Sequence, residues 1–290
     1  MTEPARYVEL HARSAFSFLE GGSLPEALAQ VCASENMPAM ALLDRNGVYG
    51  SPRFHMAAKK AGLKAHVGVE IDIHDENGKS IFPLLCESQQ GYQNLCRLLT
   101  KTKLRVPKHA PSSAQFEELE EYAAGLVCLT GDEHGPLAAA LLRGGKDAAR
   151  KVLARLVSTF GQRNVYVELQ RHFDRAQEAR NQAAVELAHE MRLPLLATNG
   201  VCYATPAERE VLDVFTCIKH KRQLATAGRL LQKNAERHIR RPGEMARIFA
   251  DLPDAITNTC ELSARLKFTL ENLGYKFPKY PVPGGGTEIE

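Results

Sequence analysis

Short apolar runs alternate with longer stretches of helical periodicity along most of the chain. Runs rich in apolar and β-branched residues predict seven strands, at residues 7–10, 39–43, 65–73, 81–86, 126–130, 165–169 and 195–198. Helical spacing of apolar residues predicts helices at 24–35, 51–61, 89–103, 136–142, 146–160 and 175–192. Strands that alternate with crossover helices are typical of a largely parallel sheet. The pattern therefore predicts an α/β fold, with seven strands in a closed or nearly closed barrel.

The pattern changes after Tyr203, where helical periodicity continues but no further strand is indicated. Helices are predicted at 206–219, 242–250 and 254–266. A segment rich in Pro and Gly follows them. We therefore predict a barrel over residues 1–205, a helical extension over 206–274 and a linker over 275–290, which we interpret as leading into a longer protein.

The composition narrows the class of protein without changing this fold. The 290 residues suffice for one α/β barrel or two modest domains, and the net charge of +3 is too small to indicate a nucleic-acid or membrane partner by itself. Seven scattered cysteines, with no Cys-x-x-Cys pair, argue against a disulfide framework or a zinc ribbon. No apolar run has the length of a signal peptide or a transmembrane helix. We expect a cytoplasmic protein with no membrane partner.

Candidate chemistry lies where the predicted strands end, because the active sites of parallel barrels form there. His11, Asp44 and Glu70 lie at or near three such ends. A histidine with carboxylates can bind divalent ions and activate water for phosphoester hydrolysis. Structural ion pairs also explain these residues, and three candidate ligands are too few to establish a metal centre. From the residues alone, both interpretations stay open.

Longer motifs identify a family. They are Phe-Ser-Phe-Leu-Glu-Gly at 16–21, Asn-Leu-Cys-Arg-Leu-Leu-Thr at 94–100, Val-Glu-Leu-Gln-Arg-His at 167–172, Leu-Ala-Thr-Asn-Gly-Val at 196–201 and Asn-Ala-Glu-Arg-His at 234–238. With these motifs the chain resembles the polymerase-and-histidinol-phosphatase (PHP) domain that opens bacterial C-family DNA polymerases, which are DNA polymerase III α-like, and most closely their error-prone branch. The resemblance runs from Tyr7 to Pro283. It implies a distorted (β/α)7 TIM-like barrel of the PHP type with a C-terminal helical extension.

The resemblance also implies a metal site, because active members of the family bind a cluster of three metals. The positions that match this site are His11, Arg13, Glu20, Asp44, Arg45, Glu70, Asp132, Gly200 and Cys202. Ligands are lost at Arg13, Arg45, Gly200 and Cys202. A further ligand falls between residues 102 and 109, where Lys103 would be another loss and His109 a less favoured replacement. An arginine cannot substitute for a lost ligand, because its guanidinium group does not deprotonate.

We therefore predict a metal-free ion-pair cluster with a structural role, in which guanidinium groups take the place of a metal beside Glu20, Asp44 and Glu70. No cofactor and no catalytic residue is expected in this chain. Cys202 leaves residual Zn²⁺ or Mn²⁺ binding as a lesser option, because a thiolate can bind zinc. The alternative is a metal-dependent phosphoesterase or 3′–5′ proofreading exonuclease with a remodelled site at His11, Glu20, Glu70, Asp132 and Cys202. A third interpretation is a free-standing barrel that binds DNA or a repair partner.

Two segments concentrate positive charge. Residues 97–109 carry five basic side chains and no acid, and residues 219–247 carry nine basic and two acidic side chains, for local charges of +5 and +7. Such segments suit phosphate backbones, although a solvated helix face is the other interpretation of each. The second segment supplies the nucleic-acid-binding candidates Lys219, Lys221, Arg222, Arg229, Lys233, Arg237, Arg240 and Arg241.

The resemblance implies the function of an N-terminal module of an error-prone, translesion DNA polymerase that acts in DNA repair. Such a polymerase is a nucleotidyltransferase that extends DNA from dNTPs with Mg²⁺. Its palm domain lies beyond residue 290 in the family, so we expect this chain to be catalytically inert alone. The implied partners are the remainder of the polymerase chain and DNA, with the sliding clamp and other mutagenic-repair proteins as further candidates.

Overall fold

The computed structural model describes residues 6–75, 78–108, 110–271 and 273. Within these ranges, eight strands form one curled sheet. In chain order they are β1 (Glu9–Ala12), β2 (Ala39–Arg45), β3 (Lys64–Asp75), β4 (Gly78–Cys86), β5 (Ala114–Gln115), β6 (Leu126–Leu129), β7 (Val165–Leu169) and β8 (Leu195–Ala197). All seven predicted strands are present, and the two-residue β5 is an addition to them.

The sheet is mixed rather than parallel throughout. Its order is β1-β2-β3-β4-β6-β7-β8, with β5 beside β3. β4 follows β3 without a crossover helix and lies antiparallel to both β3 and β6. The chain after β8 meets β1, because Val201 N donates to the His11 carbonyl oxygen and Arg13 N donates to the Val201 carbonyl oxygen, each at 2.9 Å. The sheet thus curls until its first and last segments touch, which confirms the expected distorted barrel.

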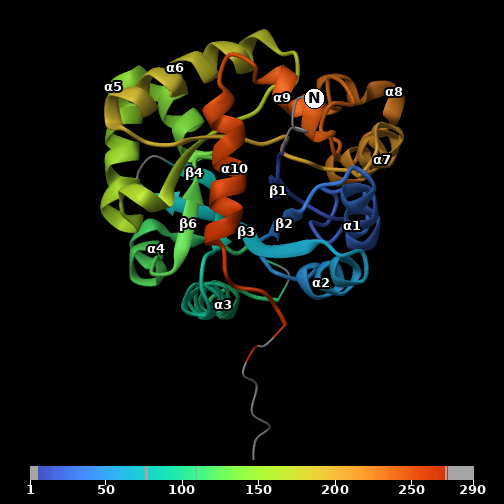
Figure 1. Ribbon diagram of the computed structural model, residues 1–290, viewed down its shortest axis with the longest axis horizontal. Coiled ribbons are helices and arrows are strands. Elements are labelled where there is room, and N and C mark those ends of the chain that lie inside the picture. Colours follow the sequence, from blue (N-terminus) through green and yellow to red (C-terminus); the bar gives the residue numbers. More distant parts are fainter. Residues whose placement is uncertain (1–5, 76–77, 109, 272, 274–290) are drawn as a thin grey trace, which may run out of the picture.

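Helices surround this sheet (Figure 1). Those between the strands are α1 (Pro25–Ser34), α2 (Ser51–Lys60), α3 (Gln89–Leu104), α4 (Phe116–Tyr122), α5 (Pro136–Phe160) and α6 (Arg175–Met191). The two helices predicted at 136–142 and 146–160 form one element, α5, which is interrupted at Gly144 and Gly145, where the backbone angles are not helical. α4 was not predicted, because four of its seven residues are glutamates and its apolar spacing is weak.

Alternating side chains divide the sheet into two faces. Met40 and Leu42 of β2 pack with the surrounding helices in the larger core, whereas Leu43 packs in a second cluster on the inner face. Because side chains alternate along a strand, the same rule places Arg45 on the inner face and Asp44 on the helix-covered face. This alternation decides which of the two side chains faces the barrel interior.

The chain after β8 forms α7 (Arg209–His220), α8 (Leu224–Ala227), α9 (Pro242–Ile248) and α10 (Pro253–Arg265). α10 packs on the barrel: Leu262 and Leu266 are fully buried in the inner cluster, and Thr259 Oγ1 accepts a 3.1 Å hydrogen bond from Val8 N. The division at residue 205 stays a prediction, and the linker expected at 275–290 lies outside the described residues. Across the described ranges, no helix combines the length and apolar character needed to span a bilayer.

Candidate functional site

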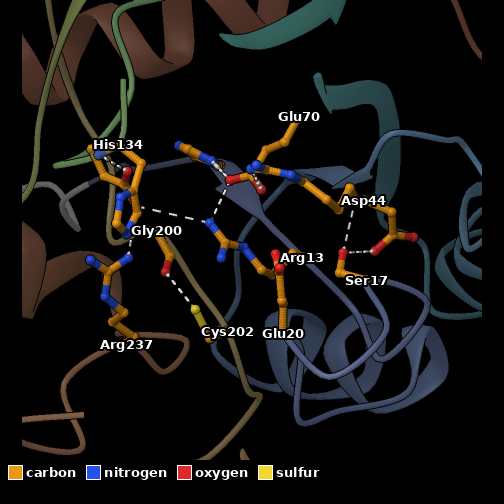
Figure 2. A network of polar contacts seen from close by, with 12 residues as sticks. Arg13, Ser17, Glu20, Asp44, Glu70, His134, Gly200, Cys202 and Arg237 are labelled. Carbon is orange, nitrogen blue, oxygen red and sulfur yellow. Dashed lines mark hydrogen bonds and ion pairs between the residues drawn. The ribbon is translucent and has the colours of Figure 1, made fainter. Parts of the chain in front are cut away.

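A buried ion-pair cluster lies on the inner face of the barrel (Figure 2). Glu70 of β3 is at its centre, with Oε1 2.6 Å from His11 Nε2 and 2.5 Å from Arg13 Nη2. The other ring nitrogen of His11, Nδ1, lies 2.6 Å from Glu168 Oε1 on β7. The side chains of His11, Glu70 and Glu168 are almost completely shielded from water. Charged side chains therefore join β1, β3 and β7.

Arg45 adds β2 to this cluster. Its Nη1 lies 3.7 Å from Glu70 Oε2, and its Nη2 forms an ion pair with Asp72. Asp72 also accepts a 2.8 Å hydrogen bond from Asn46 Nδ2 and pairs with Lys79 at 3.0 Å. We use the term Glu70 cluster for three basic side chains and three carboxyl groups: His11, Arg13, Arg45, Glu70, Asp72 and Glu168.

The charges in the Glu70 cluster stabilise one another. Burial lowers the pKa of His11, but the carboxylates of Glu168 and Glu70 outweigh it and hold that pKa well above its ordinary value of 6.5. Burial likewise raises the pKa of Glu70, whereas the Arg13 guanidinium and the His11 imidazolium lower it to about 2. At neutral pH, His11 is therefore an imidazolium and Glu70 a carboxylate.

Asp44 does not belong to this cluster, although it was predicted as part of the site. It lies on the helix-covered face, where Oδ1 accepts hydrogen bonds from Ser14 N at 2.8 Å and Ser17 Oγ at 2.9 Å. Its Oδ2 accepts one from Gly50 N at 3.1 Å, and a Cβ on Gly50 would lie only 2.3 Å from that oxygen. Burial raises the pKa of Asp44 above its ordinary value of 3.8. We use the term Asp44 site for Asp44 and these donors. Their hydrogen bonds hold the loop after β1 against the start of α2.

A second ion-pair group lies beside the Glu70 cluster. Arg237 Nη1 is 3.2 Å from Asp132 Oδ2, and Arg237 Nη2 donates to both carboxylate oxygens of Glu133 at 2.8 and 2.9 Å. Arg13 Nη2 lies 3.9 Å from Asp132 and connects the two groups. Sequence reasoning assigned Arg237 to a nucleic-acid surface, yet it is only 7% exposed. The sequence signal for a buried, ion-paired Arg237 was its place in the motif at 234–238.

The remaining matched positions lie apart from the Glu70 cluster. Glu20 lies on the rim of the barrel and pairs with Lys219 at 2.6 Å. Gly200 has a φ of +53°, and a Cβ there would lie 2.5 Å from the Gln170 side chain, so both conformation and space require a glycine. The buried Cys202 has its Sγ 3.5 Å from the Gly200 carbonyl oxygen. The glycine at position 200 thus has a conformational explanation in this chain.

One ligand position between residues 102 and 109 is left unassigned by the sequence. The described residues of this segment do not place a ligand at the site. Lys103 belongs to α3, and its ammonium group lies 6.0 Å from the centre of the Tyr49 ring. His109 lies outside the described residues. The loss expected at Lys103 therefore stays a prediction.

The side chains at this site do not fit the metal cluster that the family implies. Both ring nitrogens of His11 already face carboxylates, Glu168 at Nδ1 and Glu70 at Nε2. The guanidinium groups of Arg13 and Arg45 lie against Glu70, where a metal would need access to its oxygens. Within the described ranges, no group of three or more His, Cys, Asp or Glu side chains is arranged to hold a metal ion.

A cavity of about 580 Å³ opens beside the Glu70 cluster. Arg13, Arg45 and Arg237 line it from the two ion-pair groups, and α7 contributes Thr216 and Lys219. Fixed cations therefore border the cavity at the place where a hydrolytic metal centre would need open coordination positions.

The predicted nucleic-acid-binding residues fall into three groups. Arg237 and Arg240 are buried in ion pairs, so they do not reach the surface and that part of the prediction is wrong. Three candidates are exposed but paired with acidic side chains: Lys219, Lys233 and Arg241. Three others are exposed and form no ion pair within the part of the chain that the structure describes: Lys221, Arg222 and Arg229. The last group has its charge available for a phosphate backbone.

Comparisons with known proteins find sequence relatives along nearly the whole chain. The family model described as "PHP domain" matches residues 9–172. An error-prone DNA polymerase from Mycolicibacterium paratuberculosis is 34% identical over 291 residues, which cover 97% of this chain and 26% of the relative. One from Anaeromyxobacter dehalogenans is 33% identical over 302 residues, covering 100% of this chain and 25% of the relative. The chain thus spans about a quarter of the length of these relatives.

Solved structures give a weaker likeness. An amidohydrolase from Chromobacterium violaceum aligns with a TM-score of 0.48 and 13% identity, over 68% of this chain and 88% of the other. The family assignment therefore depends on sequence, where the match covers more than half of the chain. On that match, the chain belongs to the PHP domain family.

Proposed function

We propose that this chain is the N-terminal PHP module of an error-prone, translesion DNA polymerase, and that its Glu70 cluster is a metal-free structural core. The relatives similar to nearly the whole chain are named error-prone DNA polymerases. Because the chain spans about a quarter of their length, we assign DNA synthesis from dNTPs, with the Mg²⁺ it needs, to the rest of the polypeptide. The module stabilises the polymerase body and adds a surface to it.

The position of Arg13 is the observation that carries this proposal. The resemblance puts a metal-binding histidine at this position in active members. Here a guanidinium group lies 2.5 Å from Glu70 and 3.9 Å from Asp132. It cannot deprotonate to bind a metal, but it donates directed hydrogen bonds to carboxylates. Arg13 therefore supplies permanently the positive charge that a metal would supply when bound.

The position of the Glu70 cluster in the sheet supports a structural role. Its side chains come from β1, β2, β3 and β7, which are spread around the curled sheet. Removing one member of a buried ion pair leaves its partner uncompensated and destabilises a protein by about 3–5 kcal/mol. The cluster thus fixes the relative positions of strands that are distant in sequence, and it needs no bound ion to do so.

An activity assay tests the metal-free assignment. The purified chain is incubated with single-stranded DNA and with a chromogenic phosphodiester, in the presence of added Mn²⁺ or Zn²⁺. We expect no 3′–5′ exonuclease or phosphoesterase activity above background. Manganese-dependent activity that disappears in His11→Ala would overturn the proposal and establish the hydrolytic alternative. Thermal unfolding of the variant, with Lys219→Met as a rim control, checks that His11→Ala remains folded.

A DNA contact is the second part of the proposed role. Lys221, Arg222 and Arg229 are exposed cations suited to contacts with phosphates that carry no sequence preference. We expect their combined replacement by Ala to weaken binding of single-stranded DNA and to flatten its salt dependence by about 0.7 for each phosphate that is no longer neutralised. Replacing Lys60, Lys151 and Arg192, three exposed basic residues that likewise form no ion pair in the described part of the chain, is the matched control. Fluorescence anisotropy over a salt series measures both, and equal binding of the two variants would exclude this contact.

A further inference from the structure

We propose that one face of α7 is the docking surface for the remainder of the polymerase polypeptide. The inference rests on the proposed function, because it requires the chain to be part of a longer polymerase. It is independent of the Glu70 cluster, since none of the residues involved belongs to that cluster. In Figure 1, α7 and α8 lie together at the periphery of the molecule, beside α1.

α7 presents apolar side chains away from the barrel. Val211, Val214 and Ile218 are 40%, 49% and 57% exposed, and Phe215 is half-buried between them. Their spacing of three and four residues puts them on one face of the helix. We call these four residues the α7 stripe.

The opposite side of α7 already packs against the barrel. Leu212, Asp213 and Cys217 are its buried residues, and Thr216 and Lys219 border the cavity. A helix that uses a single apolar face for packing has a polar outer face. α7 has an apolar outer face instead, which indicates that a further structure covers it.

Among the described residues, α1 to α6, the helices between the strands, have no such stripe. On the facing surfaces of α5 and α6, Lys146 pairs with Glu186, and Arg150 pairs with Glu190 at 2.7 Å. The large apolar side chains that these helices do expose occur singly: Met56 on α2, Leu104 on α3 and Leu142 on α5, at 57%, 82% and 89% exposed. Isolated exposed apolar residues are ordinary on protein surfaces, whereas the largest contiguous apolar patch of a protein is often functional.

The size of the α7 stripe favours an occupant from the same polypeptide. It consists of four side chains, each only partly exposed. A stable complex between separate proteins buries about 800 Å² on each partner, so the stripe is too small to support one alone. A segment of the same chain needs less, because tethering raises its effective concentration to about the millimolar range.

The relatives have such a segment available. The region that matches this chain is 26% and 25% of the length of the two error-prone polymerases described above. About three-quarters of each polypeptide therefore lies outside the module and needs a surface on which to meet it. Docking on the α7 stripe would put the polymerase body next to Lys221 and Arg222, which follow directly at the end of α7.

Hydrogen exchange tests this docking in the full-length polymerase that carries the module. We expect amides of residues 209–220 to exchange at least tenfold more slowly there than in the 290-residue chain. The pair Val214→Glu and Ile218→Glu should remove this difference while leaving the melting temperature of the 290-residue chain unchanged. Met56→Glu on α2, an equally exposed apolar position, is the matched control and should leave the protection of α7 intact.

Several results would overturn the proposal. One is equal exchange of α7 in the two proteins, and another is protection that appears only when DNA is added. A dimer of the 290-residue chain that Val214→Glu dissociates would assign the stripe to a second copy. A reading frame that ends at residue 290 would overturn both the docking and the proposed function. Manganese-dependent nuclease activity with α7 still protected would overturn only the metal-free assignment.

Discussion

Glu70 and Asp44 are equally buried, at 1% exposure each, yet the protein compensates their charges by opposite means. Glu70 has the cations of His11, Arg13 and Arg45 around it. Asp44 has hydroxyl and backbone N–H donors, which are neutral. The pKa of Glu70 is accordingly held at about 2, whereas that of Asp44 is raised above 3.8 by burial. Fixed cations thus occur where a carboxylate faces the barrel interior, and neutral donors suffice on the helix-covered face.

Glu70→Gln is expected to have the largest effect on stability. The substitution leaves three cations with one fewer carboxylate between them, which we expect to cost about 3–5 kcal/mol of the free energy of unfolding. Urea denaturation of the variant and the wild-type chain measures this loss. A loss below about 1 kcal/mol would contradict the view that the cluster is a structural core.

Asp44→Asn is expected to have a smaller effect. The amide oxygen still accepts part of the hydrogen bonds from Ser14, Ser17 and Gly50, so we expect a loss of about 1–3 kcal/mol. No cation is left without its carboxylate partner, in contrast to the change at Glu70. A loss as large as that of Glu70→Gln in the same denaturation series would remove the distinction between the two sites.

The pH dependence of these two variants should have opposite signs. The pKa of Glu70 is lowered from 4.5 to about 2, so its stabilisation is complete above pH 4.5 and is lost as the pH falls toward 2. The pKa of Asp44 is raised from 3.8, so the folded state favours its protonated form and the contribution weakens as the pH rises above 3.8. In this acidic range, the difference in the free energy of unfolding between wild type and Glu70→Gln therefore grows as the pH rises. The corresponding difference between wild type and Asp44→Asn becomes smaller. Denaturation of all three proteins through this range measures both slopes, and slopes of the same sign would contradict the comparison.

Lys219→Met should have the smallest effect. The pair of Lys219 with Glu20 has a separation of 2.6 Å, but the Lys219 side chain is 44% exposed. Solvent screening limits such a pair to about 0–1 kcal/mol, and salt weakens it further. We expect the variant to unfold within about 1 °C of wild type in roughly 0.5 M salt, by the same screening argument. A clear destabilisation in a thermal scan would show that the rim belongs energetically to the cluster.

The sequence predicted much of this fold because its strands are short apolar runs with clear boundaries. It also contained a signal that separates Asp44 from Arg45. Leu43 faces the barrel interior, so period-two alternation places Arg45 there and Asp44 opposite. Grouping both residues by family position, rather than by strand face, concealed this difference between them.

Glu168 and Arg237 show what sequence patterns leave out. Glu168 lies within a recognised motif and a predicted strand, but its partner His11 is far away in the sequence. Arg237 lies in the most basic segment, which favoured a surface role, and its acids Asp132 and Glu133 come from a distant loop. Pairings of this kind depend on how the sheet curls. A basic residue adds the same charge to a segment whether it is exposed or buried, so only the fold shows which of the two it is.

The metal content of the purified chain tests the central claim most directly. The protein is purified without chelators, dialysed against Zn²⁺ and Mn²⁺, freed of excess metal and analysed by mass spectrometry, and its melting temperature is measured with and without EDTA. Because Arg13 and Arg45 already neutralise Glu70, we predict no stoichiometric metal and no change in melting temperature on adding EDTA. One or more tightly bound ions per chain, with a melting temperature that falls when EDTA removes them, would contradict the replacement of the metal site by ion pairs.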